Sequence, residues 1–344
     1  MKPITSLYSL LILSLLLLLN YSRAQAQHLV PLPPGPETSL RGLSVVNDSV
    51  AWISGSSGWT ASTADAGRTW QWQQAPGYQT LDFRDIEAFS AERAVMVSAG
   101  SPAVILRTAD GGRTWQEVYR NESPDIFLDG MDFWDDQRGL LYGDPIAGQM
   151  QLLQTLDGGQ TWQNISPNIP VPLKEGEASF AASGTGIRTL GRGHAWIATG
   201  GRVSRVFHST DYGRTWVVHD LPILQGKPST GPFSIAFFDP KRGVAAGGDY
   251  QMDTLRQDNF RRTTDGGRSW HAPKQGPFGY RSAVEYVSKN TIIATCTSGT
   301  DISTDGGRSW QRLSPEGYHT VRKAKAGNWV LLTGSKGRIA TLKR

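Results

Sequence analysis

The sequence contains a single cysteine, Cys296, among 344 residues. One thiol cannot form an internal disulfide, and a chain of this length buries a sufficient core without cross-links. Neither sign of charge dominates, because 35 Lys and Arg residues stand against 30 Asp and Glu residues and leave a formal net charge of +5. So mild a balance indicates no nucleic acid or other polyanionic partner.

Motifs of several enzyme classes are also missing. The chain has no Gly-x-Ser-x-Gly elbow of a serine hydrolase and no dinucleotide-binding fingerprint. Gly226-Lys227 resembles the end of a phosphate loop, but the earlier glycine is absent. The six histidines are scattered without the spacing of metal ligands. We therefore expect no metal, no cofactor, and no nucleotide or redox chemistry.

One long apolar run is present, at the start of the chain. Lys2 precedes residues 7–19, which are dominated by leucine. This run is shorter than the roughly 20 residues that span a bilayer, and it is followed by Ala24-Gln25-Ala26, a small-x-small cleavage site. We expect residues 1–26 to be a cleaved secretory signal, and residues 27–344 to be a secreted or periplasmic protein without a membrane anchor.

The rest of the chain carries one pattern six times, and it is rich in glycine (39) and tryptophan (12), as a turn-rich all-β chain is. In each copy Ser or Thr is followed by Asp two positions on, Gly two further, Thr or Ser two further, and Trp next. The copies span residues 63–70, 108–115, 155–162, 209–216, 263–270 and 303–310. Their aspartates, Asp65, Asp110, Asp157, Asp211, Asp265 and Asp305, lie 40 to 54 residues apart. Such a period indicates a supersecondary unit that buries its faces against its neighbours.

Each element of the pattern has a structural reason. The Asp side chain accepts hydrogen bonds from nearby backbone N–H groups and the Gly supplies a positive φ, so together they close a tight hairpin. The Trp begins the next strand and offers a flat surface to the neighbouring unit. Strand-like stretches precede each copy, for example residues 85–89, 94–98 and 104–106. Four antiparallel strands in about 45 residues are typical of a β-propeller blade.

The repeated pattern resembles the Asp-box, or bacterial neuraminidase repeat. Asp-box propellers include sialidases, sortilin-type receptors, xyloglucanases and the photosystem II stability/assembly factor family. The form Thr-x-Asp-Gly-Gly-Arg-Thr-Trp is most similar to the last family and its non-photosynthetic bacterial relatives, and the resemblance covers essentially all of residues 27–344. It implies a propeller that serves as a platform for partner proteins.

The presence of six boxes does not require a ring of six blades. After Trp310, the strand-like stretches 319–324, 328–333 and 337–342 have no box behind them. An N-terminal strand usually completes such a blade, and residues 28–32 are available for this. We expect a single all-β, seven-bladed propeller of four-stranded antiparallel blades over residues 27–344, with a six-bladed ring as the alternative. The expected blades are 39–76, 82–120, 126–167, 178–221, 232–274, 279–314, and 317–344 with the N-terminal strand.

The two faces of such a ring have different roles. Successive turns of an antiparallel blade alternate between faces, so the six boxes share one face, where we expect their aspartates to be structural. The long segments that do not repeat fall on the other face: 121–129, 166–177, 221–232, 249–260 and 273–280. Insertions gathered on one face of a repeat array commonly mark the binding face.

Charged and aromatic residues recur near the starts of the innermost strands, where they would converge on the mouth of the central channel. They are Arg41, Arg84, Asp129, Glu177, Tyr280, Arg281 and His319. This set predicts an arginine-rich pocket for a carboxylate or another anion, since guanidinium groups bind carboxylates in bidentate fashion. The alternative is that these charges pair with one another and with water. Asp249 and Tyr250, and the run 177–185, are further candidates on the same face.

Two functions remain open. The first is a non-catalytic, monomeric binding or assembly platform that engages a protein or glycan partner on the face opposite the boxes. The second is a glycoside hydrolase. Resemblance to sialidases would assign Arg41, Arg84 and Arg281 to a substrate carboxylate, Tyr280 with Glu177 to the nucleophile, and Asp129 to acid/base catalysis. The Arg-Ile-Pro motif of sialidases is replaced by Arg41-Gly42-Leu43, which argues against this second function.

Overall fold

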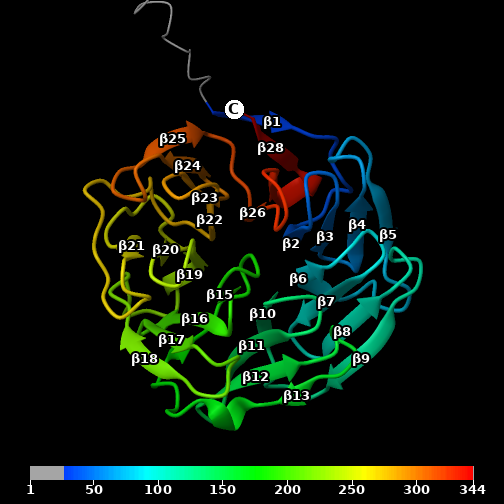
Figure 1. Ribbon diagram of the computed structural model, residues 1–344, viewed down its shortest axis with the longest axis horizontal. Coiled ribbons are helices and arrows are strands. Elements are labelled where there is room, and N and C mark those ends of the chain that lie inside the picture. Colours follow the sequence, from blue (N-terminus) through cyan, green and yellow to red (C-terminus); the bar gives the residue numbers. More distant parts are fainter. Residues whose placement is uncertain (1–26, 344) are drawn as a thin grey trace, which may run out of the picture.

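A computed structural model describes residues 27–343, so the predicted signal segment, residues 1–26, lies outside the described residues. Seven antiparallel sheets surround a central axis in the order of the sequence (Figure 1). The fold is thus the seven-bladed all-β propeller that the repeats predict, and the six-bladed alternative is wrong. The described helices are two short 3₁₀ turns, η1 (Ser166–Asn168) and η2 (Ser335–Gly337), and no helix within residues 27–343 has the length and apolar character needed to cross a membrane.

The strands of each blade follow one another outward from the axis (Figure 1). The first four blades consist of β2 (Leu40–Val45), β3 (Ala51–Gly55), β4 (Trp59–Thr63) and β5 (Gln71–Gln74); β6 (Asp82–Ala88), β7 (Ala94–Ala99), β8 (Ala103–Thr108) and β9 (Gln116–Asn121); β10 (Leu128–Phe133), β11 (Gly139–Ile146), β12 (Gln149–Thr155) and β13 (Gln163–Asn164); and β14 (Glu177–Ala178), β15 (Ile187–Leu190), β16 (His194–Gly201), β17 (Arg205–Ser209) and β18 (Val217–Asp220). The last three consist of β19 (Thr230–Phe237), β20 (Gly243–Asp249) and β21 (Phe260–Thr263); β22 (Ala283–Tyr286), β23 (Ile292–Cys296), β24 (Gly299–Ser303) and β25 (Gln311–Ser314); and β26 (Thr320–Lys323), β27 (Val330–Thr333), β28 (Ile339–Lys343) and β1 (His28–Pro31).

The last blade contains strands from both ends of the described chain. β1 pairs antiparallel with β28, from His28 opposite Lys343 to Pro31 opposite Ala340. In Figure 1 the blue β1 lies beside the red β28. Because this pairing supplies the fourth strand of the seventh blade, the ring is closed by backbone hydrogen bonds within one sheet.

Two blades depart from four regular strands. In the fifth, the outer strand is reduced to an isolated bridge between Arg262 and His271. Pro273 and Pro277 follow it, and proline has no N–H group to donate to a strand ladder. In the fourth, the inner strand is divided into β14 and β15, which both pair with β16. Residues 179–186, between these two strands, leave the sheet, and we call this segment the plug.

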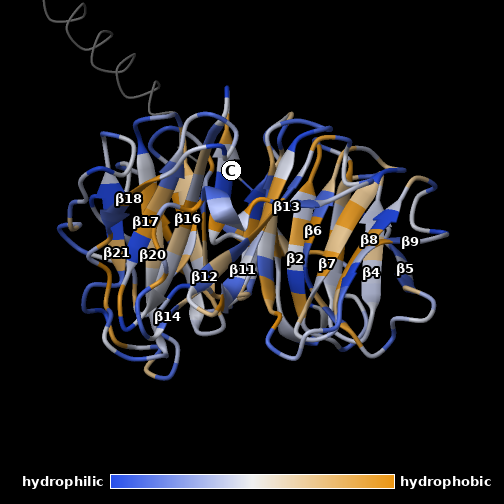
Figure 2. Ribbon diagram, turned by 90° about the horizontal axis from the view of Figure 1, so that it is seen from below, coloured by the Kyte–Doolittle hydropathy of each residue, from blue (hydrophilic) through white to orange (hydrophobic). Residues whose placement is uncertain are grey.

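The hydrophobic core is a ring of clusters between neighbouring blades. Trp196 of the fourth blade packs with Ile235 of the fifth, and Leu331 of the seventh packs with Leu43 of the first. The Trp that ends a box takes part as predicted, since the ring of Trp310 lies 4.9 Å from that of Phe260 in the preceding blade. Figure 2 shows the apolar centres of the strands between two layers of more polar loops. Each blade therefore depends on its neighbours for burial.

The boxes are held by local hydrogen bonds. Asp65 Oδ1 accepts from the backbone N–H of Thr69 at 2.9 Å, and Oδ2 accepts from the Thr69 hydroxyl at 2.7 Å. The hydroxyl of Thr63 donates to Asp65 at 2.9 Å and accepts from the N–H of Gly67 at 3.1 Å, and Gly67 has φ +76°. The same contacts occur in the other five boxes. These side chains satisfy backbone groups of their own hairpins, which is a structural task.

Candidate functional site

A pocket of about 470 Å³ lies at the mouth of the central channel. Every blade contributes to its wall, through Arg41, Arg84, Asp129, Phe180, Phe233, Tyr280 and His319 in order of blade. The inner strands begin at this end of the ring, whereas the boxes lie in turns between third and fourth strands. Because turns alternate between faces, the pocket is on the face opposite the boxes, and none of the six box aspartates lines it.

Four wall residues share one position in their blades. Arg41, Arg84, Asp129 and Phe233 are each the unpaired residue of a β-bulge in the inner strand. A bulge leaves one residue outside the ladder and changes the direction of its side chain. All four residues line the pocket, so the repeated bulge directs side chains from four blades towards one space.

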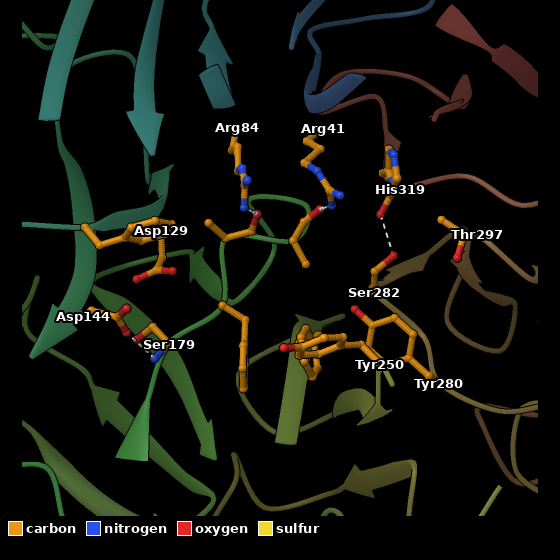
Figure 3. Close-up of a pocket in the computed structure, with 15 residues that line it drawn as sticks. Arg41, Arg84, Asp129, Asp144, Ser179, Tyr250, Tyr280, Ser282, Thr297 and His319 are labelled. Atoms are coloured by element: carbon orange, nitrogen blue, oxygen red, sulfur yellow. Dashed lines mark hydrogen bonds between the residues drawn. The ribbon is translucent and has the colours of Figure 1, made fainter. Parts of the chain in front are cut away.

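The plug extends into the centre of the ring (Figure 1). Its residues 179–182 line the pocket and form its floor (Figure 3). Gly184 at its centre has φ +66°, and a Cβ there would lie 2.2 Å from the carboxylate of Asp85. Hydrogen bonds join the plug to all six other blades. They connect Arg41 to the Ala182 carbonyl oxygen (2.8 Å), Arg84 to that of Ala181 (3.4 Å), the Ser179 N–H to Asp144 (2.8 Å), Thr185 to Ser234 (2.6 Å), Ser183 to the Ser282 carbonyl oxygen (2.7 Å) and Arg322 to that of Gly184 (3.1 Å). The plug therefore closes the inner end of the pocket, and the pocket opens on one face of the ring.

Arg41 and Arg84 lie side by side on one wall (Figure 3). Arg84 also donates from Nε to Asp82 at 2.7 Å. Burial, and then the charge of Arg84, lowers the pKa of Arg41, yet a guanidinium group keeps its charge at neutral pH. The two arginines provide donors for an anionic group. The sequence predicts three arginines near the channel mouth, but Arg281 does not line the pocket.

Two carboxyl groups occupy another part of the wall, next to Ser179 of the plug (Figure 3). Asp144 Oδ1 accepts from the Ser179 N–H at 2.8 Å, whereas neither oxygen of Asp129 has a hydrogen-bond partner among the described residues. Burial, and then the charge of Asp144, raises the pKa of Asp129 well above its usual range, and burial raises that of Asp144. Asp144 is not among the residues that the sequence pattern predicts for the channel mouth. Its signal is Pro145, which marks an irregular point in β11, where a bulge falls between Gly143 and Pro145.

Aromatic rings form the remaining wall. Phe180 of the plug stacks on Phe233 at 3.9 Å, and Tyr280 meets Phe233 edge-on at 4.7 Å. Tyr250 lies at the rim and is 50% exposed. Burial lowers the pKa of His319 to about 3, so its imidazole is neutral at pH 7. The pocket thus combines an arginine pair, two carboxyl groups and apolar rings.

Three predicted site residues do not line the pocket, because each is engaged elsewhere. Arg281 is fully buried and donates from Nε to Asp301 at 2.8 Å. Glu177 is buried and accepts hydrogen bonds from Arg205, from Nε at 2.9 Å and from Nη2 at 2.6 Å. Asp249 is buried and accepts the N–H of Gln251. A buried charge requires a partner, and these charges take theirs inside the fold.

The constellation implied by resemblance to sialidases is therefore not assembled in the pocket. Arg41, Arg84, Asp129 and Tyr280 line it, but Arg281 and Glu177 do not. Across residues 27–343, no three or more His, Cys, Asp or Glu side chains are grouped so as to hold a metal ion.

Fold and repeats together define an Asp-box, seven-bladed β-propeller, the type that the six boxes predict. A family model described as photosynthesis system II assembly factor YCF48 matches residues 35–125. Those residues contain the first two blades and their boxes. A sequence comparison with curated proteins finds no match.

Solved structures share the whole ring at low sequence identity. YCF48 from Cyanidioschyzon merolae matches with a TM-score of 0.67 at 15% identity, covering 91% of this chain and 98% of that one. YCF48 bound to D1 peptide matches with a TM-score of 0.60 at 15% identity, over 92% and 94%. The GH74 xyloglucanase from Xanthomonas campestris matches with a TM-score of 0.61 at 15% identity, over 91% of this chain and 53% of that one. At this identity the likeness shows the fold.

Proposed function

We propose that this protein is an exported, non-catalytic platform that binds a peptide segment of a partner protein on the face opposite the Asp-boxes. The observation that carries the proposal is the preformed pocket at the channel mouth, with its plug floor and its walls of opposite charge. Preorganised polar groups in a largely apolar cavity are typical of binding sites. The YCF48 structure bound to D1 peptide supports a peptide ligand for a propeller of this type.

The rim of the pocket favours a protein partner. Tyr250 and Met252 follow β20 in the insertion 249–260, and they are 50% and 52% exposed. Aromatic and methionine side chains are enriched in protein interfaces, where they bury large apolar area. Such residues beside a polar pocket provide a surface that extends the contact beyond one side chain.

The proposal is tested by comparing the two faces. The full chain, tagged and exported, is used to capture partners from the envelope of the cell that produces it, beside a Tyr250→Ala/Met252→Ala variant. The matched control is Leu156→Ala/Phe238→Ala, two residues that are 62% and 39% exposed and that follow the third strand β12 and the inner strand β19, at box-face turns. We expect the captured partner to lose at least about tenfold in affinity for the pocket-face variant only. Loss with the control variant alone would contradict the proposal.

A glycan-active enzyme is the second candidate, and one observation favours it. Asp129 and Asp144 share the pocket, and glycoside hydrolysis uses two carboxyl groups on either side of the scissile bond. A screen with fluorogenic sialosides and neutral glycosides, run with Asp129→Asn and Asp144→Asn variants, decides between the candidates. Turnover that either variant abolishes would establish the enzyme, whereas absence of turnover favours the platform.

We further propose that residues 1–26 direct export, on the strength of their apolar run and small-x-small site. Cell fractionation of the full chain beside a chain lacking residues 2–26 tests this. Export predicts a shorter, processed protein outside the cytoplasm for the full chain and retention of the truncated one. An unprocessed full chain in the cytoplasm would contradict it.

A further inference from the structure

The corner formed by Asp129, Asp144 and Ser179, which we call the acidic corner, lacks partners for several acceptors. Asp129 is 1% exposed and Ser179 is 5% exposed. The two carboxylate oxygens of Asp129 have no hydrogen-bond partner among the described residues, and the hydroxyl of Ser179 has none either. All three residues line the pocket and lie on one side of it (Figure 3).

Such an arrangement is unusual for a folded protein. Buried polar atoms are nearly always hydrogen-bonded, and each exception calls for an explanation. Arg84, whose charge acts on Asp129, does not provide a hydrogen bond to it, because Arg84 directs Nε to Asp82 and Nη1 to the Ala181 carbonyl oxygen. Both oxygens of Asp129 and the hydroxyl of Ser179 are therefore buried at the wall of the pocket without a hydrogen-bond partner among the described residues.

The chemistry of the missing partner follows from the acceptors. An ammonium group carries three donors and no acceptor, and a guanidinium group carries five donors in a planar fork. Either group would satisfy several acceptors of the corner at once and would neutralise the charge of two neighbouring carboxyl groups. No group of three or more His, Cys, Asp or Glu side chains that could hold a metal ion occurs among the described residues.

We propose that the acidic corner receives one ammonium or guanidinium group of the bound peptide, from a lysine or arginine side chain. This inference rests on the proposed function of the pocket as a peptide site. The arginine pair on the neighbouring wall would then face an acidic group of the same segment. The corner selects peptides that carry a basic residue, and it rejects those that place an apolar or acidic residue there, because the buried acceptors would stay unpaired.

The test uses the full chain and two matched probes, Nα-acetyl-lysine methylamide and Nα-acetyl-norleucine methylamide, which differ in the ammonium group. Calorimetric titration gives the affinity of each probe. We expect the lysine probe to bind at least about tenfold more tightly, since a hydrogen-bonded buried charge contributes roughly that factor. Asp129→Asn should remove most of this preference, and Glu122→Gln, an exposed acid after β9 on the same face, should leave it unchanged.

Equal affinity for the two probes in the unaltered protein would overturn the inference, and so would an unchanged preference in Asp129→Asn. Asp144→Asn provides the same decision if Asp129→Asn does not fold. Binding of calcium chloride at the corner that excludes the lysine probe would show a metal site instead and would also overturn it. If substitutions at Tyr250 and Met252 lower partner affinity but substitutions at Asp129 and Asp144 do not, the role of the acidic corner is refuted and the proposed platform is retained. If none of these substitutions lowers partner affinity, the proposed platform is refuted.

Discussion

The hydroxyl of Ser183 donates to the main-chain carbonyl oxygen of Ser282 at 2.7 Å. Ser183 belongs to the plug, and Ser282 directly precedes β22 of the sixth blade. Ser183 is 1% exposed, so its hydrogen bond forms away from water. This contact connects the floor of the pocket to a blade that is distant in sequence, and it makes the pocket part of the folded ring.

We expect Ser183→Ala to lower the free energy of unfolding by about 1–3 kcal/mol, because the buried carbonyl oxygen of Ser282 loses a donor. Urea unfolding measures the change. Thr304→Ala, at an exposed position of the last box, should stay within about 0.5 kcal/mol of the unaltered protein. Equal stability of the two variants would show that the plug is not anchored by Ser183.

We expect a substitution in the buried Glu177–Arg205 ion pair to lower the stability of the fold without changing partner affinity. Both side chains are buried, so Glu177→Gln leaves a buried guanidinium group without its counter-charge and should destabilise the fold by about 3–5 kcal/mol. Adding Arg205→Met should recover much of this loss. Partner affinity at a temperature where the variant is folded should stay unchanged, and a selective loss of affinity would return Glu177 to the site.

The boxes predict acid sensitivity with a defined sign. The backbone N–H and then the hydroxyl of Thr69 lower the pKa of Asp65 to about 2, and Thr114 does the same for Asp110. The unfolded chain, with ordinary aspartate pKa values near 4, takes up protons first as the pH falls. The stabilisation is therefore full above about pH 4 and is lost as the pH falls towards 2. The difference in melting temperature between the unaltered protein and Asp110→Asn should shrink between pH 5 and pH 2, and a constant difference would contradict this.

We expect His319 to make the stability of the fold depend on pH in a milder range than the boxes do. Burial, and then the charge of Arg41, lowers its pKa to about 3, whereas an unfolded histidine titrates near 6.5. Between these values only the unfolded chain is protonated, so stability falls as the pH drops from about 6.5 towards 3, by at most about 1.4 kcal/mol per pH unit. His319→Gln should lose less stability than the unaltered protein between pH 7 and pH 5. An NMR titration that places the His319 pKa near 6.5 would refute this.

The sequence predicts those features that depend on contacts between residues close together in the chain. Each box is closed by side chains that form hydrogen bonds with backbone groups within four residues, as Asp65 does with Thr69. The box can therefore be recognised from the sequence alone. The position of the starts of inner strands also follows from the repeat. This is why Arg41, Arg84 and Asp129 were placed near the channel mouth, where they line the pocket.

Features that depend on contacts between distant residues were not predicted. Residues 179–186 carry no periodic signal, and the path of this segment is set by hydrogen bonds to all six other blades. Whether a charge faces the pocket or the core depends on its partner, and neither Asp301 for Arg281 nor Arg205 for Glu177 stands at a diagnostic spacing. The repeat predicts four strands in every blade, but the outer strand of the fifth blade is reduced to one bridge. Pro273 and Pro277 follow this bridge, and proline cannot donate a hydrogen bond to a strand ladder.

The most direct test of the central claim, binding on the face opposite the boxes, is hydrogen–deuterium exchange of the full chain with and without its captured partner. We predict slower exchange on binding in the plug, residues 179–186, and in the insertion 249–260, with no change in the six box hairpins. Protection confined to the box hairpins, with the plug and the insertion unaffected, would contradict the account.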